Sequence, residues 1–316
     1  MKFGLHNPSF LPTTGEVRDV WPELRARAQW AEAVGFDYFT VMDHMVQVPG
    51  IGSADEPFLE GWMALAALAE ATERLHLATL VTAVGYRNPA LLVKMATTLD
   101  LISGGRAILG LGAGWTRAEF ETYGYGKPSD FPRPGVRLAQ LREVIQIAKA
   151  LWADRRATYE GQHFSVRDAV LEPKPLQQPR PRVLVGGEGE QVTLRIMAQE
   201  ADMANFFTPG PQAFARKLEV LRGHCQAVGR DVQELEVSVL DYLLLAPTAA
   251  LAEEKWQRRG GRTRGGYRGL MGSPDQVVAQ VRAYEGAGAQ AIFLMVHNAD
   301  AESRELLARE VMPASL

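Results

Sequence analysis

The chain has 316 residues, of which 47% are hydrophobic and 22% are charged. These proportions are typical of a folded globular protein and exclude disordered and collagen-like chains, and the length suits one large α/β barrel or two ordinary domains. Thirty-four basic and 37 acidic side chains give a formal net charge of −3, which supplies no overall field for holding nucleic acid or an anionic membrane.

Short apolar strands return along the chain, and each is followed by a segment with helical periodicity. Neither a long linker nor a clear internal repeat divides the sequence. Eight such strands in this length predict an α/β fold, a (β/α)8 TIM barrel formed as a single domain over residues 1–316. The predicted strands are Lys2–Leu5, Tyr38–Met42, Leu75–Val81, Ala107–Leu111, Arg182–Val185, Ala201–Phe206, Leu235–Leu245 and Ala291–Val296.

Start and stop signals delimit the helices between the first strands. Asp19 is placed to cap the first helix, Pro22 suits its first turn, and Gly35 ends it. Asn88-Pro89 starts a later helix and Gly104-Gly105 ends it. In both cases the next strand follows directly, as expected for βα units.

Two stretches are too long to be simple connections. The first is an insertion after strand four, about residues 113–181, with a predicted helix at Val136–Trp152 and a small hairpin through Tyr159–Phe164. The second follows strand seven, about residues 247–273, and we expect a mobile flap there.

The flap contains an arginine- and glycine-rich run at Arg258–Arg268. A lid that orders over an anionic cofactor or substrate fits this run, and a simple solvated loop fits it equally well. The composition also resembles a nucleic-acid-binding tract. That interpretation is disfavoured because the run is short and holds only Tyr267 as a stacking residue after Trp256.

Catalytic residues of barrel enzymes gather at the carboxyl ends of the strands, where loops vary around a packed interior. Strand two ends in Met42-Asp43-His44, which puts a carboxylate and an imidazole at this rim. His44 could move a proton near neutral pH. A purely structural hydrogen bond between Asp43 and His44 is the competing interpretation.

Two glycine-rich turns follow later strands. Gly110–Trp115 allows a ligand to approach the backbone closely, and Gly186–Glu190 precedes a helix whose N-terminal N–H groups could hold a phosphate. The sequence has no HExxH, Walker or GxSxG motif, so metallohydrolase, P-loop and α/β-hydrolase functions are disfavoured. No metal site is predicted.

Cys225 is the single cysteine, so no intramolecular disulfide can form. Its place in a predicted helix indicates a packing residue and not a nucleophile. The N-terminus lacks a signal-peptide pattern, and no apolar run reaches the ~20 residues that cross a bilayer. We therefore expect a cytoplasmic protein that does not bind a membrane.

Three motifs in this order resemble the luciferase-like monooxygenase superfamily: Leu75–Ala90, Leu99–Arg106 and Gly110–Trp115. The similarity extends over nearly the whole chain. Within the superfamily, Asp43-His44 followed by Tyr86–Pro89 most resembles the branch that uses the deazaflavin coenzyme F420. The alternative is a branch that uses reduced FMN.

The resemblance implies a flavin-type ring at the mouth of the barrel. Matching positions imply cofactor contacts from Asp43, His44, Thr79, Leu80, Thr82 and Ala113, and a phosphate held by N–H groups of Gly186, Gly187, Gly189 and Glu190. Relatives also imply a non-prolyl cis peptide bond between Thr79 and Leu80.

The substrate prediction rests on a departure from the family pattern. Sugar-phosphate dehydrogenases of the F420 branch carry a catalytic glutamate where this chain has Trp115, and Glu119 lies one helical turn further on. Together with Phe58 and Trp62, Trp115 predicts an apolar or aromatic substrate wall. Glu119 is included among the candidate substrate residues.

The sequence therefore predicts an F420-dependent oxidoreductase that transfers a hydride between the deazaflavin and a small, largely apolar organic substrate, with His44 as the catalytic residue. A reduced-FMN monooxygenase is the first alternative, and a non-catalytic ligand-binding barrel is the second. Relatives imply a homodimer, and no nucleic-acid partner is expected.

Overall fold

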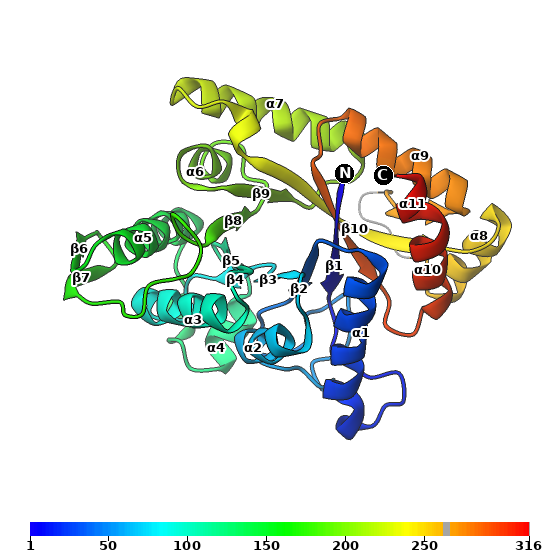
Figure 1. Ribbon diagram of the computed structural model, residues 1–316, viewed down its shortest axis with the longest axis horizontal. Helices are drawn as coiled ribbons and strands as arrows, with labels where there is room; N and C mark the ends of the chain where they lie inside the picture. The colour runs from blue at the N-terminus through cyan, green and yellow to red at the C-terminus, as the bar shows by residue number, and fades with distance from the viewer. Residues whose placement is uncertain (262–265, 316) are drawn as a thin grey trace.

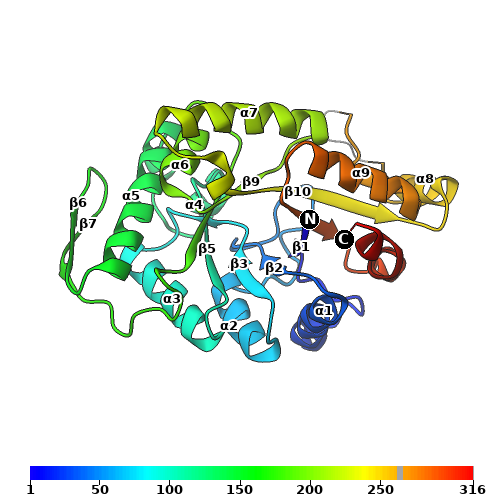
Figure 2. The same cartoon turned by 45° about the horizontal axis from the view of Figure 1, so that its top comes forward.

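The computed structural model describes residues 1–261 and 266–315. Eight parallel strands form a closed barrel ringed by helices (Figures 1 and 2), because β9 pairs with β10 and β12 pairs with β1. The predicted TIM barrel is confirmed. Its strands are β1 (Lys2–Asn7), β2 (Tyr38–Val41), β3 (His76–Thr79), β5 (Ala107–Gly112), β8 (Arg182–Gly186), β9 (Met203–Phe206), β10 (Glu236–Leu245) and β12 (Ala291–Val296).

The helices that follow these strands cover the outside of the barrel and bury most of the hydrophobic core against it. They are α1 (Val20–Val34), α2 (Gly61–Ala71), α3 (Pro89–Ile102), α5 (Pro134–Ala153), α6 (Thr193–Glu200), α7 (Pro211–Ala227), α9 (Pro274–Gly286), α10 (Ala301–Leu306) and α11 (Met312–Ala314). Cys225 is fully buried in α7, as predicted.

The helix boundaries follow the sequence signals with one exception. Gly35 ends α1 in the left-handed conformation with φ 94°, and the Asn88 side chain accepts hydrogen bonds from two N–H groups of the first turn of α3. Asp19 does occupy the position before α1, but its carboxylate makes no cap bond. It accepts a hydrogen bond from the Thr14 hydroxyl instead.

The third strand, predicted as Leu75–Val81, is shorter in the structure, where β3 ends at Thr79 and the separate short strand β4 (Thr82–Ala83) follows it. The non-prolyl cis peptide bond lies between Leu80 and Val81, so the prediction of a cis bond between Thr79 and Leu80 is wrong. The Leu80 N–H still donates to the Val41 carbonyl at 2.9 Å. This bond extends the pairing with β2 as far as Leu80. The chain therefore leaves the pairing with β2 one residue later than predicted.

The insertion after β5 holds the predicted helix, α5, and the predicted hairpin, which β6 (Ala157–Glu160) and β7 (Ser165–Ala169) form. It also holds the short helix α4 (Arg117–Thr122). The segment predicted as a flap contains α8 (Ala249–Arg258) and β11 (Leu270–Gly272). Residues 262–265 of that prediction lie outside the described residues.

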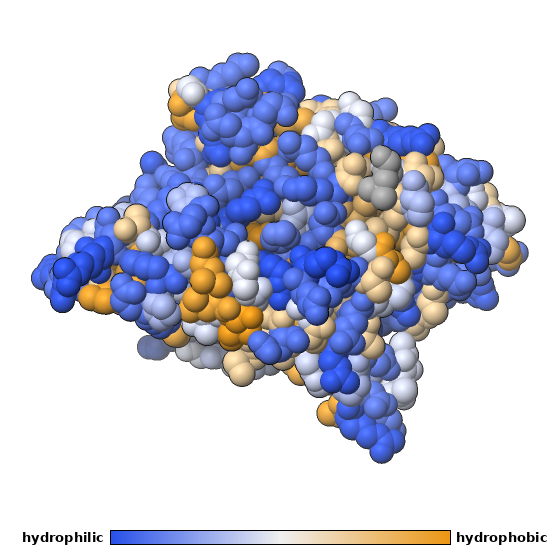
Figure 3. Space-filling model, viewed as in Figure 1, coloured by the Kyte–Doolittle hydropathy of each residue, from blue (hydrophilic) through white to orange (hydrophobic). Residues whose placement is uncertain are grey.

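The face drawn in Figure 3 is largely hydrophilic, with an apolar group of residues where Figure 1 draws α3. Leu91 and Ile102 of this helix are exposed. Within residues 1–261 and 266–315, no helix has the length and hydropathy of a membrane span.

Alternate residues of each strand point into the barrel and fill it in layers. On β1 these residues are Lys2, Gly4 and His6. Gly4 is required because a Cβ there would lie 2.4 Å from the ring of Phe293 on the neighbouring strand β12. The middle layer is apolar, so it separates a charged cluster below from the polar residues above.

The charged cluster is centred on Glu236. Its carboxylate accepts hydrogen bonds from Tyr38 Oη at 2.5 Å, from Lys2 Nζ at 2.7 Å and from an Arg182 guanidinium nitrogen at 3.1 Å. Burial alone would raise the pKa of Glu236, but the bonds from Lys2 and Tyr38 and the charge of Arg182 hold it below its ordinary value. The ionised carboxylate therefore stabilises the closed lower end of the barrel.

We expect Glu236→Gln to lower the free energy of unfolding at pH 7 by about 2 kcal/mol, because two cations lose their common anion. Since the folded pKa lies below the unfolded value of about 4.3, the wild-type contribution is present above that pH and is lost as the pH falls through the folded pKa. Urea denaturation between pH 3 and 7 measures this loss.

The matched control is Glu160→Gln, which changes an exposed glutamate of β6 that pairs with Arg167. It should change the stability by less than about 0.5 kcal/mol. Equal effects of the two substitutions would show that the buried cluster contributes nothing particular.

Candidate functional site

A cavity of about 690 Å³ opens at the carboxyl ends of the strands, and each of the eight barrel strands, or the loop after it, contributes to its wall. The wall is mainly apolar, with a few polar groups, as in sites that bind small molecules. The lining residues used below are His6, His44, Leu80, Val81, Ala83, Gly114, Trp115, Thr116, Gly186, Gly187, Glu188 and Asn205.

His44 lines the cavity and is held from behind by Glu119. The Nδ1 atom of His44 lies 2.8 Å from Glu119 Oε2, and the ring meets Trp115 edge to face with centroids 6.1 Å apart. The Glu119 carboxylate also accepts hydrogen bonds from the Met45 N–H at 2.6 Å and from the Tyr86 hydroxyl. Three donors therefore converge on one buried carboxylate.

The charge state of Glu119 follows from these contacts. Burial alone would raise the pKa of this carboxyl, but the hydrogen bonds from His44, Tyr86 and the Met45 N–H hold it below its ordinary value. An ionised Glu119 can only accept hydrogen bonds, so the Nδ1 atom of His44 must carry a proton. The Nε2 atom is then the nitrogen that can exchange a proton with a bound molecule.

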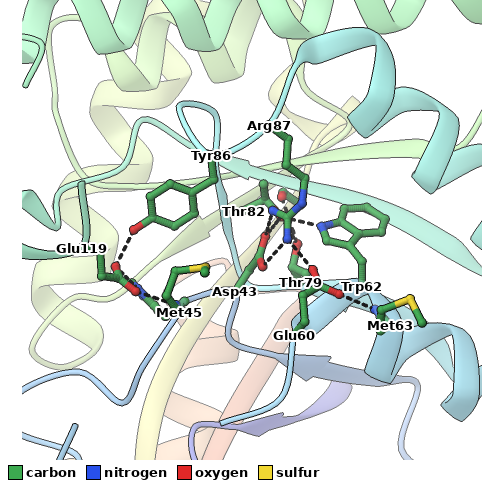
Figure 4. A network of polar contacts seen from close by, with 12 residues as sticks. Asp43, Met45, Glu60, Trp62, Met63, Thr79, Thr82, Tyr86, Arg87 and Glu119 are labelled. Carbon is green, nitrogen blue, oxygen red and sulfur yellow. Dashed lines mark hydrogen bonds and ion pairs between the residues drawn. The ribbon is translucent and has the colours of Figure 1, made fainter. Parts of the chain in front are cut away.

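Asp43 does not pair with His44, so the competing interpretation, a structural hydrogen bond between them, is wrong. Figure 4 shows Asp43 facing Arg87, which binds it through two nitrogens at 2.6 and 2.9 Å, and Asp43 does not line the cavity. The Thr82 hydroxyl donates to the same carboxylate at 2.6 Å. Successive residues at the end of an extended strand point to opposite sides, which sends Asp43 away from the histidine.

The cofactor contacts predicted around β3 divide into two groups. Leu80 lines the cavity together with Val81 and Ala83, which the sequence did not single out. Thr79 and Thr82 are fully buried instead, with their hydroxyls 2.9 Å apart. Figure 4 shows both within the polar network around Asp43, and neither lines the cavity.

Ala113 also lies off the main cavity. It lines a smaller cavity of about 150 Å³ behind Gly114 and Trp115. The residue placed to contact a cofactor in the main cavity is therefore its neighbour Gly114, which lines that cavity.

The turn after β8 borders the cavity, but its backbone is less open than predicted. Gly186 and Gly187 line the wall, and the Gly187 N–H donates to the Asn205 carbonyl at 3.1 Å. That N–H is therefore occupied, which corrects the predicted set of four donors. Gly189 and Glu190 follow, ahead of α6.

A cation that the sequence did not single out lies beside this turn. Lys217 of α7 donates to the Glu188 carbonyl at 3.1 Å and to the Glu190 carboxylate at 2.6 Å. Because α7 is distant in sequence, only the fold brings this charge to the turn.

Of the four predicted substrate residues, Trp115 alone lines the main cavity. Trp115 lines the cavity and is 64% exposed, so its ring is available to a ligand. Trp62 is buried and donates through Nε1 to the Thr82 hydroxyl at 3.0 Å, while Phe58 packs against Phe10. Neither lines the cavity, and Glu119 supports His44 from behind.

His6 and Asn205 are cavity residues that the sequence interpretation missed. The His6 ring lies 2.9 Å from the Thr40 hydroxyl, and burial together with the nearby His44 lowers its pKa to about 3. His6 is therefore neutral at physiological pH. Asn205 donates to the Ser238 hydroxyl at 2.9 Å. Counting alternate residues upward from Lys2 on β1 would have placed His6 at the rim.

Bare backbone and unsatisfied polar atoms indicate that this cavity fits a cofactor with a flat ring and an anionic tail. A Cβ at Gly186 would lie 3.0 Å from Val81, so the glycine leaves room for the chain reversal after β3. Among the described residues, the buried Thr116 hydroxyl and Arg137 Nε have no hydrogen-bond partner. Thr116 lines both cavities and Arg137 lines the smaller one next to Trp115, so a polar group of a bound molecule could pair with them there.

No group of three or more histidine, cysteine, aspartate and glutamate side chains that could hold a metal ion occurs in the part of the chain that the structure describes.

The chain is similar to known proteins in sequence and in fold. The family model for luciferase-like monooxygenases matches residues 1–264. The chain is 32% identical over 258 residues to the pyrimidine monooxygenase RutA of Stutzerimonas stutzeri (strain A1501), a match that covers 79% of this chain and 66% of that protein. The chain thus spans just under two thirds of the length of this relative.

Two solved structures have the same fold over the whole chain. The monooxygenase RslO1 from Streptomyces bottropensis superposes with a TM-score of 0.83 at 21% identity and 100% coverage of both chains. The coenzyme F420 dependent tetrahydromethanopterin reductase from Methanopyrus kandleri gives a TM-score of 0.80 at 18% identity, with 100% of this chain and 99% of that chain covered.

The contact with Glu119 predicts the tautomer of His44. In the wild-type protein the neutral ring should carry its proton on Nδ1, and Glu119→Gln should give a mixture of tautomers because an amide can also donate. The 15N chemical shifts of the imidazole measure the two forms. Glu121→Gln, at the exposed end of α4, should leave the wild-type tautomer unchanged. A wild-type ring protonated on Nε2 would contradict the assignment.

Proposed function

The chain belongs to the luciferase-like monooxygenase family, and from this membership we propose that it is a flavin-dependent oxidoreductase, with reduced FMN as the first candidate cofactor and a small, largely apolar molecule as substrate. The observation that carries the proposal is a single cavity. It is lined by His44, whose Nδ1 atom is bound by Glu119, and by the glycine backbone after β5 and β8. The names of the relatives at 32% identity favour a monooxygenase.

Hydride transfer with the deazaflavin F420 is the second candidate. The sequence around Asp43-His44 and Tyr86–Pro89 resembles the F420 branch. The imidazole of His44 also fits this chemistry, because hydride transfer to or from a carbinol carbon needs a partner for the hydroxyl proton.

The side chains of the site would position the substrate, transfer a proton and exclude water. Bound FMN would supply oxygen activation, and bound F420 would supply a hydride. His44 would exchange a proton with the substrate through Nε2, while Glu119 holds the ring through Nδ1. Trp115 would cover a flat or apolar substrate, and the mainly apolar wall would limit access of water.

The cofactor is decided by parallel titrations of the protein with FMN, reduced FMN and F420, followed by absorbance and fluorescence. We expect reduced FMN to bind most tightly. We also expect oxygen to be consumed when a flavin reductase supplies reduced FMN in the presence of a substrate. Tight binding of F420 alone, without oxygen uptake, would select the second candidate. If neither cofactor bound, the protein would be a non-catalytic ligand-binding barrel.

His44→Ala should lower kcat by about 10² to 10⁴-fold, the range typical of lost general acid–base catalysis, and leave cofactor affinity within about threefold. Stopped-flow turnover and cofactor titration measure the two effects. Glu121→Gln, which lies on α4 outside the cavity, is the control. Unchanged turnover in the alanine variant would remove His44 from the mechanism.

The turn after β8 is the proposed phosphate site. Gly189→Asp should weaken binding of FMN about tenfold relative to Gly189→Ala, because it adds a negative charge near the phosphate, and both variants should bind riboflavin alike. Fluorescence titrations of the two variants with FMN and riboflavin test this. Equal losses for both ligands would place the phosphate elsewhere.

A further inference from the structure

A second cavity of about 420 Å³ lies beside the mouth of the barrel. It meets the main cavity at four residues that line both, Gly50, Phe207, Tyr242 and Met295. We call it the side compartment. Its other lining residues are Thr208, Asp241, Leu243, Leu244, Trp256, Arg259, Gly261, Tyr267, Arg268 and His297.

Much of the wall of the side compartment is apolar and well ordered by its contacts. Leu243 and Leu244 of β10 are buried, and Trp256 of α8 packs against the small core that contains Leu244. The Arg268 guanidinium lies 4.0 Å from the centre of a Trp256 ring, and it also pairs with Glu253 at 2.5 Å. The compartment therefore suits a hydrocarbon chain or ring.

One end of the side compartment presents unused hydrogen-bonding capacity. Thr208 is only 3% exposed, and its hydroxyl has no partner among the described residues. A buried hydroxyl without a partner is unfavourable and points to a ligand that supplies one.

His297 adds a second donor on the same wall. Its Nδ1 atom accepts a hydrogen bond from the Ala299 N–H at 3.2 Å, so the neutral ring carries its proton on Nε2. Partial burial, and to a lesser extent the charge of Arg259, lower the pKa of His297 and favour this neutral form.

Arg259 gives the side compartment a charged donor for an anion. Arg259 binds Asp300 at 3.0 Å through one nitrogen, and the planar guanidinium has further donors. The carboxylate of Asp241 lines the compartment too, but it is 1% exposed and accepts hydrogen bonds from the hydroxyls of Tyr267 at 2.5 Å and Tyr284 at 2.8 Å. The hydrogen-bonding capacity of Asp241 is thus used by two hydroxyls, whereas Arg259 has donors that its single contact with Asp300 does not use.

Resting on the proposed function, we propose that the substrate is an apolar molecule with a carboxylate at the end remote from the reacting carbon. The reacting end lies in the main cavity beside His44. The hydrocarbon chain of the substrate runs past the rings of Phe207 and Tyr242, which pack edge to face with centroids 5.6 Å apart. The carboxylate lies in the side compartment, where Arg259, His297 and the Thr208 hydroxyl donate to it.

Isothermal titration of the protein without cofactor tests this with three probes: hexanoate, decanoate and decan-1-ol. Decanoate should bind about tenfold more tightly than either other probe, because only decanoate has both the length and the charge. Leu244→Trp, which fills the compartment, should abolish the advantage over hexanoate. Arg259→Gln should abolish the advantage over decan-1-ol.

Two further variants control for folding and for general charge. Thr208→Val keeps the shape of the side chain. It should weaken the binding of decanoate about threefold and leave the circular dichroism spectrum unchanged. Arg258→Gln changes the neighbouring exposed arginine, which lies outside the compartment, and should have no effect. In the Arg259 variant, Asp300 keeps its ion pair with Lys255 at 2.5 Å.

Equal binding of decanoate and decan-1-ol by the wild-type protein would overturn the proposal, as would an unchanged preference in Arg259→Gln or Leu244→Trp. These measurements need neither FMN nor F420. Failure of both cofactors to bind would overturn the proposed function alone. Absence of the preference for a carboxylate would overturn only the proposal that the side compartment binds one.

Discussion

The paired hydrogen bonds between Arg87 and Asp43 hold the mouth of the barrel together. Asp43 is 3% exposed, and an unpaired carboxylate at that depth would be strongly unfavourable. The guanidinium joins the loop after β2 to the loop after β4, and it reaches Glu60 ahead of α2 as well. The position of His44, one residue after Asp43, depends on this anchor.

The two buried carboxylates of the site have separate roles because they have separate partners. Asp43 is neutralised by a permanently charged arginine, whereas Glu119 accepts from groups that include a histidine able to gain or lose a proton. Tyr86 and Arg87 are adjacent in sequence, and one bonds to each carboxylate. A single short loop thereby holds both Asp43, which is paired with arginine, and Glu119, which contacts His44.

Much of the fold could be predicted from the sequence. Strand periodicity, the Gly35 stop and the Asn88 cap are local signals, and each describes what the chain does within about one turn or one strand. The hairpin of the insertion was also found this way. The position of the cis bond was missed by one residue, because the hydrogen bond from Leu80 to Val41 belongs to a neighbouring strand and leaves no mark in the local sequence.

The sequence alone determined that a barrel forms, that its rim carries His44 and Trp115, and that glycines leave backbone bare beside them. These properties depend on residue type and spacing. Only the tertiary structure decided that Glu119 supports His44, that Asp43 turns to Arg87, and that Trp62 is buried. Side-chain partners across different loops are set by the closure of the barrel, which brings together residues 44 and 119 regardless of their separation along the chain.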